Sequence, residues 1–252
     1  MELNLKGKVA LVTGAGSQIG MGKAIAITLA KEGCDVIVTD IDQEGLEKTA
    51  SEVKSIGSQV IAIKANVTKK VDVEEMVDTV LKQFGKIDIL INAAGAGTPD
   101  KPFLEKTEAE WDADINLNLR GVLYCTKAIL PQMLARKSGK IVNISSCASK
   151  LSSPTASTYA AAKTGVIGFT RALAGEVARD GVNVNAVSPG LTLTNFLKNI
   201  DPDKLKFFLS MIPTGKANTA QDIANMVVFL ASDVSANIVG QNFSVDGGMT
   251  MN

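Results

Sequence analysis

Two side chains suited to proton transfer, Tyr159 and Lys163, stand four residues apart in a stretch predicted to be helical. This spacing makes them neighbours on one face of the helix. A free tyrosine has a pKa of about 10 and is a poor base at neutral pH. An ammonium about 4 Å away, at an effective dielectric of about 20, would stabilise the phenolate by about 4 kcal/mol, or at most roughly three pKa units. The pair therefore suits an acid/base tyrosine, although such a pair on its own is more often a solvated helix face.

The composition restricts the other chemistries, because the 252 residues include no histidine. Ser-His-Asp hydrolysis, Cys-His catalysis, histidine zinc sites and histidine phosphotransfer are excluded. The formal net charge is zero, so we expect neither nucleic acid nor a membrane as a partner. Three cysteines, Cys34, Cys125 and Cys147, are odd in number and lack metal-ligand spacing, which favours a reducing, cytoplasmic location and no metal. No stretch reaches the roughly 18 apolar residues of a membrane helix, and no signal segment is expected.

A glycine-rich turn follows the first predicted strand and leads directly into a helix. Glycines let the backbone approach a pyrophosphate, and the helix N-terminus supplies free N–H groups and a positive dipole end. The strand–turn–helix context favours a dinucleotide site over a simple tight turn. The residues expected to contact the dinucleotide here are Gly14, Ser17, Gln18, Ile19, Gly20, Met21 and Gly22.

Asp40 ends the second predicted strand, twenty residues after Gly20. An acidic group at this place bonds the adenosine ribose hydroxyls and repels the 2′-phosphate of NADP. No arginine or lysine stands beside it in residues 39–42. We therefore predict NAD as the cofactor; the alternative is a solvated aspartate at a strand end.

Apolar runs of strand length alternate with helical patterns from end to end. Strands are predicted at Lys8–Thr13, Asp35–Thr39, Val60–Lys64, Ile87–Asn92, Gly139–Ser145, Val182–Val187 and Asn242–Val245. Helices are predicted at Gly20–Glu32, Gln43–Ile56, Val71–Phe84, Thr107–Arg136, Thr155–Ala178 and Ala220–Ala231. The strands are nearly continuous Val, Ile and Leu, as in parallel sheets covered on both faces. We predict one α/β domain over residues 1–252, a Rossmann-type doubly wound parallel sheet of about seven strands with helices on both faces.

Six motifs in order resemble those of the short-chain dehydrogenase/reductase family, and the resemblance covers nearly the whole chain. They are the glycine-rich turn after Thr13, the turn Asn92–Gly95, Asn118, Ser146, the Tyr159/Lys163 pair, and the segment Asn185–Gly190. So many motifs in the right sequence are highly specific.

The resemblance implies a role for each of four catalytic residues. Tyr159 exchanges the hydroxyl proton, and Lys163 lowers its pKa and binds the nicotinamide ribose. Ser146 hydrogen-bonds the carbonyl oxygen of the substrate, and Asn118 holds a water of the proton path. Further cofactor contacts are implied at Ile41, Asn66, Val67, Asn92, Ala93, Ala94, Gly95, Pro189, Gly190, Thr192 and Thr194.

Three departures from the family pattern bear on the cofactor site. The family leaves three residues between its first two glycines, whereas five separate Gly14 from Gly20, so that Gly22 becomes the last glycine of the motif. Asn66 stands where many members have aspartate, and its amide is expected to bond the adenine edge. Ala93 replaces the second asparagine of the turn, with no expected effect.

The segment Leu191–Thr214 takes the place of the family's variable substrate lid. It is apolar with interspersed lysines, which fits a lid over an apolar or alicyclic substrate, with lysines near a phosphate-bearing tail. The equally weighted alternative is an amphipathic helix pair that packs on its own domain.

The resulting prediction is an NAD(H)-dependent oxidoreductase that interconverts a small secondary alcohol and a ketone. The first alternative is a 3-oxoacyl carrier-protein or acyl-CoA reductase. Members that act on carrier protein generally prefer NADPH and often have a basic residue where Gly175 stands, so both features weigh against this alternative. The second is a non-catalytic dinucleotide-binding sensor, disfavoured by the intact set of four residues. The helices Thr107–Arg136 and Thr155–Ala178 resemble those through which the family associates, which implies a homotetramer.

Overall fold

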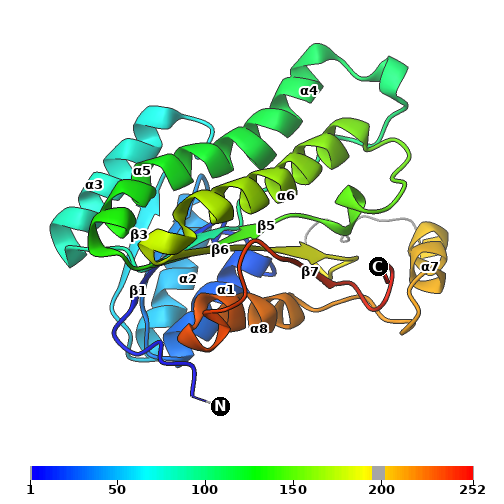
Figure 1. Cartoon of the computed structure of the whole chain (residues 1–252). Helices are drawn as coiled ribbons and strands as arrows, with labels where there is room; N and C mark the ends of the chain where they lie inside the picture. Colours follow the sequence, from blue (N-terminus) through cyan, green and yellow to red (C-terminus); the bar gives the residue numbers. More distant parts are fainter. Residues whose placement is uncertain (1, 195–201, 252) are drawn as a thin grey trace.

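Seven parallel strands form one sheet in the computed structural model, which describes residues 2–194 and 202–251 (Figure 1). The strands are β1 (Val9–Thr13), β2 (Asp35–Asp40), β3 (Val60–Lys64), β4 (Ile89–Asn92), β5 (Gly139–Ile144), β6 (Val182–Pro189) and β7 (Asn242–Val245). Their order across the sheet is β3-β2-β1-β4-β5-β6-β7. The predicted Rossmann-type sheet is confirmed, with every strand within about two residues of its expected bounds.

The sheet is buried on both faces, which explains its nearly continuous apolar strands. In β1, Ala10 and Val12 face one hydrophobic cluster, whereas Val9 and Leu11 face the other. All four side chains are buried. Successive side chains of a strand point to opposite faces of the sheet. Because each face of β1 packs against a hydrophobic cluster, the side chains on both faces must be apolar.

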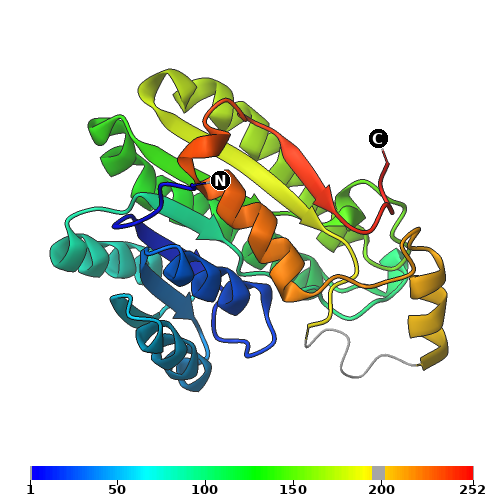
Figure 2. The ribbon, with the colours of Figure 1, turned by 90° about the horizontal axis from the view of Figure 1, so that it is seen from below.

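Helices cover both faces of the sheet. They are α1 (Met21–Lys31), α2 (Gln43–Ser55), α3 (Lys70–Phe84), α4 (Glu108–Ile115), α5 (Gly121–Arg136), α6 (Ser157–Val177), α7 (Pro202–Ser210) and α8 (Ala220–Ala231). One face carries α1, α2 and α8, and the other carries α3, α5 and α6 (Figures 1 and 2). Side-chain caps fix several starts: Asp42 caps α2, and Thr107 and Thr219 form capping boxes at α4 and α8.

The helix predicted over Thr107–Arg136 is wrong in one respect, because a π-helical segment at Asn116–Arg120 divides it into α4 and α5. Within this segment, the side-chain amide of Asn118 donates to the backbone oxygen of Asp114 at 2.9 Å. A regular α-helix keeps that oxygen for the backbone N–H four residues on. The side chain enters the hydrogen-bond ladder, and wide turns of this kind are frequent at functional sites.

Helix α7, which falls in the predicted lid, lies beyond the carboxyl ends of the strands and stands apart from the other helices (Figures 1 and 2). Part of that prediction, including Phe196, Leu197 and Lys198, lies outside the described residues. Leu193, Phe207 and Met211 are at least half exposed. Among the residues that the structure describes, no helix is long and apolar enough to cross a membrane.

Candidate active site

Nearly all of the predicted site residues lie at the end of the sheet that is formed by the carboxyl ends of its parallel strands. The glycine-rich turn follows β1, Asp40 ends β2, and Ser146 lies just after β5. β1 and β4 are parallel neighbours, but the strands that follow β1 are added on one side of it and those from β4 onward on the other, and ligands of open α/β sheets bind at such a switch point.

The glycine-rich turn packs so closely that two of its glycines have no room for a side chain. Gly14 has a φ of +72°, and a Cβ there would lie 2.7 Å from the Cα of Ala94. A Cβ on Gly22 would lie 2.2 Å from the backbone oxygen of Gly14, so only a glycine lets the start of α1 approach the turn this closely. Helix α1 starts after Gly20 with no side-chain cap and no acidic residue in its first turn. Its first N–H groups thus suit an anion such as a pyrophosphate.

The two extra residues of this turn reach across to α2. Gly20 N–H donates to the Ser17 oxygen at 3.0 Å and closes the turn. Gln18 Nε2 donates to the oxygens of Gly16 at 2.9 Å and Gly45 at 2.8 Å, and to Thr49 Oγ1 at 3.3 Å. The Gln18 side chain therefore ties the enlarged turn to α2, a role that the sequence did not predict, while Ile19 is 41% exposed.

Asp40 lies against the same turn. Its Oδ2 accepts from Gly16 N–H at 2.9 Å, and its Oδ1 accepts from Ile41 N–H at 2.7 Å and Asp42 N–H at 3.1 Å. Three backbone donors hold the carboxylate in one orientation beside the anion-binding turn. The structure thus places the Asp40 carboxylate against the glycine-rich turn, with lone pairs left for hydroxyl donors.

The turn after β4 is held by a side chain of the neighbouring strand β1 rather than by its own side chains. Thr13 Oγ1 accepts from the N–H groups of Ala93 and Ala94, each at 3.0 Å. Asn92 is buried, and its amide donates to Asn143 Oδ1 at 2.8 Å, so its side chain supports the carboxyl end of the sheet. Thr13 and Asn143 were missed as supporting residues; their signal is a polar residue at the buried end of an apolar strand.

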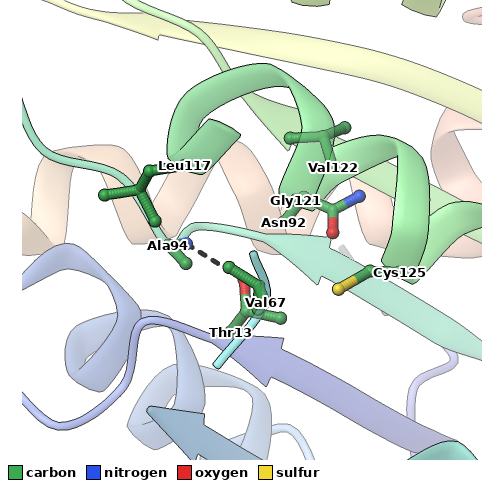
Figure 3. A pocket seen from close by; sticks show the side chains of 8 residues that line it. All are labelled: Thr13, Val67, Asn92, Ala94, Leu117, Gly121, Val122 and Cys125. Carbon is green, nitrogen blue, oxygen red and sulfur yellow. Dashed lines mark hydrogen bonds between the residues drawn. The ribbon is translucent and has the colours of Figure 1, made fainter. Parts of the chain in front are cut away.

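A small pocket lies beside this turn, lined by Thr13, Val67, Asn92, Ala94, Leu117, Gly121, Val122 and Cys125 (Figure 3). Two predicted adenine-side residues differ in their availability. Val67 lines the pocket, whereas Asn66 Oδ1 accepts from both the N–H and the hydroxyl of Thr68. Among the described contacts, only the Asn66 NH₂ group remains for a base edge.

Lys163 and Asn118 form the buried inner part of the site, and Gly95 lies in the exposed loop next to them. Lys163 Nζ donates to the Ile144 oxygen at 2.8 Å, and Asn118 donates to the Ala96 oxygen at 2.7 Å. Asn118 Oδ1 is buried without a partner. A Cβ on Gly95 would lie 2.9 Å from this Oδ1 and 3.0 Å from Lys163 Nζ. An orphaned acceptor facing an ammonium across a missing side chain fits a polar guest such as a ribose hydroxyl or a water.

Tyr159 and Ser146 face each other at the outer part of the site. Burial raises the pKa of Tyr159, and a hydrogen bond with Ser146 opposes this shift. The expectation that Lys163 lowers the pKa of Tyr159 is not met in this state. The ammonium is held by Ile144 and lies 5.8 Å from the centroid of the Tyr159 ring. Burial also lowers the pKa of Lys163 to about 8.

The segment after β6 is fixed next to the site by Asn218. Its N–H donates to the Leu191 oxygen and its oxygen accepts from Leu193 N–H, both at 2.8 Å. Thr192 is buried, with its hydroxyl on the Gly190 oxygen at 2.9 Å, so it shapes the turn after Pro189. Thr194 is the last described residue before the gap at 195–201.

Comparison with known proteins decides the family. A family model described as Enoyl-(Acyl carrier protein) reductase matches residues 14–250. The 3-oxoacyl-[acyl-carrier-protein] reductase FabG of Thermotoga maritima is 38% identical over 249 residues, which cover 99% of this chain and 100% of that protein. This chain belongs to the short-chain dehydrogenase/reductase family. It is therefore an oxidoreductase that uses a nicotinamide dinucleotide.

Two further proteins that are similar to this chain have different described activities. The (2S)-[(R)-hydroxy(phenyl)methyl]succinyl-CoA dehydrogenase subunit BbsD of Thauera aromatica is 41% identical over 252 residues, 99% of either protein. A solved chain from Sinorhizobium meliloti 1021, described as a short-chain alcohol dehydrogenase, superposes with a TM-score of 0.94 at 35% identity and covers 99% of this chain and 98% of its own. Because the FabG and BbsD relatives are named for thioester substrates, they support the predicted alternative, a 3-oxoacyl reductase, better than the main prediction, a dehydrogenase of secondary alcohols in general.

Proposed function

We propose that this short-chain dehydrogenase/reductase interconverts 3-hydroxyacyl and 3-oxoacyl thioesters with NAD(H). The proposal rests on one observation: four side chains lie close together at the carboxyl ends of the strands, near the uncapped N-terminus of α1. They are Ser146, Tyr159, Lys163 and Asn118. Names of relatives with full-length coverage support the thioester. The product or substrate remains a secondary alcohol or a ketone, as predicted from the sequence.

The cofactor that the family implies fits residues on three elements. The glycine-rich turn and α1 would hold the pyrophosphate, Asp40 the adenosine ribose, and Lys163 the nicotinamide ribose beside Gly95. The bound nicotinamide would supply or accept the hydride.

The protein's own residues would handle the oxygen and its proton. Ser146, which faces Tyr159, would donate to the substrate oxygen and stabilise the charge that develops on it. Tyr159 would donate its proton to that oxygen in reduction and remove it in oxidation. Lys163 and Asn118 would pass the proton onward through a water in the gap left by Gly95.

NAD rather than NADP is proposed because of the fixed Asp40 carboxylate. A dianionic 2′-phosphate placed near it would meet a like charge that three backbone donors prevent from turning away. The apolar, exposed Leu193, Phe207 and Met211 support an apolar acyl group. Gly175 places no basic side chain on the exposed surface of α6, although a Cβ there would meet nothing within 4 Å, and this absence of a basic group supports coenzyme A over a carrier protein as the thioester carrier.

The test is a spectrophotometric assay of purified protein in both directions with NAD(H) and NADP(H). Substrates are 3-oxoacyl-CoA, 3-oxoacyl carrier protein and an enoyl-CoA, together with cyclic and sugar alcohols. Turnover of the 3-oxoacyl-CoA, lost in Tyr159→Phe, is expected. Activity on free alcohols alone would refute the thioester assignment, and dinucleotide binding without any turnover would favour the sensor alternative.

A homotetramer and a cytoplasmic location stay part of this proposal. The three cysteines are free, as a reducing compartment requires. Sedimentation of the purified protein tests the tetramer, which a stable monomer would refute.

A further inference from the structure

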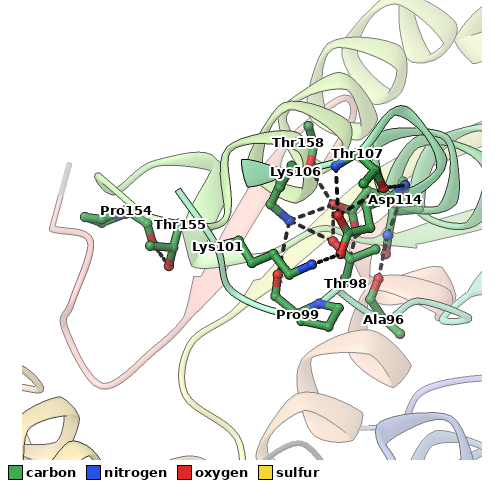
Figure 4. Close-up of polar contacts among 12 residues, drawn as sticks. Ala96, Thr98, Pro99, Lys101, Lys106, Thr107, Asp114, Pro154, Thr155 and Thr158 are labelled. Atoms are coloured by element: carbon green, nitrogen blue, oxygen red, sulfur yellow. Dashed lines mark hydrogen bonds and ion pairs between the residues drawn. The ribbon is translucent and has the colours of Figure 1, made fainter. Parts of the chain in front are cut away.

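A buried ion pair lies next to the four catalytic residues and was not foreseen from the sequence. Lys106 Nζ is 3.6 Å from Asp114 Oδ2, and the two side chains are 1% and 0% exposed (Figure 4). Lys106 lies just before α4, and Asp114 lies within that helix. Burying both charges is expensive, so a pair of this kind contributes little net stability compared with two apolar side chains.

The carboxylate of Asp114 joins three separate segments. Thr98, in the loop between β4 and α4, donates its N–H to Oδ1 at 2.9 Å and its hydroxyl to Oδ2 at 3.0 Å. Thr158, at the start of α6, donates its hydroxyl to Oδ2 at 2.5 Å. Lys106 completes the cluster with a 2.7 Å hydrogen bond to Thr98 Oγ1. One side chain thus fastens the loop and α6 to α4.

Each of the fastened segments carries a part of the proposed site. Thr158 directly precedes Tyr159. The backbone oxygen of Asp114 accepts from the Asn118 amide, which also bonds the loop at Ala96. A Cβ on Gly97 would lie 3.6 Å from Cδ2 of Tyr159, so the loop passes over the tyrosine ring.

We propose that Asp114, with its charge balanced by Lys106, is a positioning residue that sets Tyr159 and Asn118 relative to the loop after β4. This inference rests on the proposed oxidoreductase function. Asp114 acts through Thr158, Thr98 and its own backbone, and it touches neither substrate nor cofactor. A misplacement of about 1 Å at reacting groups costs roughly a hundredfold in rate, so this anchoring affects turnover more than binding.

The test compares two double variants that both remove the ion pair without leaving a lone buried charge. Lys106→Met/Asp114→Leu removes every acceptor from Thr98 and Thr158, and we expect kcat to fall by about tenfold or more. KM for NAD should stay within about twofold, because the dinucleotide site is elsewhere. Lys106→Met/Asp114→Asn keeps an acceptor oxygen for Thr98 N–H and should restore most of kcat.

The pH profile supplies a readout that a merely structural role would not move. Burial raises the pKa of Tyr159, the bond to Ser146 lowers it, and the charges of Cys147 and Asp114 raise it again by smaller amounts. The other charged groups near the tyrosine are Lys163 on α6 and Lys106 behind Asp114. In the Lys106→Met/Asp114→Asn variant, the pH at which alcohol oxidation rises should therefore move to lower values.

Lys101→Met is the matched control. Lys101 joins the same loop to α4 through Glu110 at 2.6 Å, but near the surface, and its loss should leave kcat unchanged. Undiminished kcat in the leucine variant, alongside a wild-type activity that Tyr159→Phe abolishes, would overturn this inference alone. Absence of wild-type turnover would refute the proposed function instead. Hydrogen exchange of the Thr98 amide would then decide the anchoring, since it should accelerate in the leucine variant and an unchanged rate would refute it.

Discussion

The ammonium of Lys163 is directed at the backbone oxygen of Ile144, 2.8 Å away, while the ring of Tyr159 lies beside it at 5.8 Å. The lysine is buried, with a single strong acceptor for three donors. Its pKa falls to about 8 because burial disfavours the charged form. Lys163, the lysine of the proposed catalytic set, is thus kept at a cost to folding stability, and this cost can be measured.

Lys163→Met should abolish turnover and at the same time stabilise the fold. The folded pKa of about 8 lies below the ordinary value of 10.5, so the folded state disfavours the proton at pH 7. The shift corresponds to a penalty of about 3 kcal/mol in the free energy of unfolding. Wild-type stability recovers as pH rises from 8 to 10.5, so the advantage of the variant should shrink over that window. Denaturant unfolding at pH 7 and pH 10 measures it, with Lys163→Arg as the charged control; a variant less stable than wild type at pH 7 would contradict the argument.

Gly95→Ala should reduce turnover without unfolding the protein. The added Cβ would lie 2.9 Å from Asn118 Oδ1 and 3.0 Å from Lys163 Nζ, where it would displace a guest held between them. We expect kcat to fall by about a hundredfold or more, the usual scale for proton transfer by a positioned side chain. The control is Gly168→Ala on α6, where a Cβ meets nothing within 4 Å, and its kcat should match wild type. Equal kcat for Gly95→Ala would show that no relay passes through this gap.

The fold was predictable because its signals are local and repeated. Nearly continuous apolar strands separated by helical patterns predicted one sheet architecture. The spacing around Gly14, Gly22 and Tyr159 predicted the candidate active site. What escaped depends on contacts between distant segments. Lys106 and Asp114 are eight residues apart, a spacing that does not pair side chains on a helix, and they meet because the chain turns at Thr107 before α4 begins.

The π-helical segment at Asn116–Arg120 escaped for a related reason. Its apolar periodicity continues that of α4 and α5, and only the engagement of Asn118 with both Asp114 and Ala96 widens the turn. Likewise, the partners of Gln18 lie on α2, some 27 to 31 residues along the chain. Spacing alone could show that the turn was enlarged, but not what the enlargement contacts.

Gln18→Ala tests whether this contact matters for the cofactor. It removes the bonds to Gly45 and Thr49 that tie the enlarged turn to α2, together with the bonds to Gly16 and Lys23. A looser turn must be ordered on binding, so we expect the Kd for NAD to rise by about fivefold, or about 1 kcal/mol. Fluorescence titration with NADH measures this change. Glu52→Gln removes only the exposed ion pair to Lys23 and should leave Kd unaltered, and an unaltered Kd in Gln18→Ala as well would assign the contact to folding alone.

Asp40→Asn separates the charge of the carboxylate from its backbone contacts. The amide oxygen can still accept from Gly16 or Ile41, so the turn keeps part of its support. With the negative charge gone, a 2′-phosphate is no longer repelled and the ribose hydroxyls lose a charged acceptor. We expect the ratio of kcat/KM for NADP to that for NAD to rise by about tenfold or more, equivalent to about 1.4 kcal/mol. Steady-state kinetics with both cofactors measures it, and an unchanged ratio would remove Asp40 as the discriminator and with it the reason for proposing NAD.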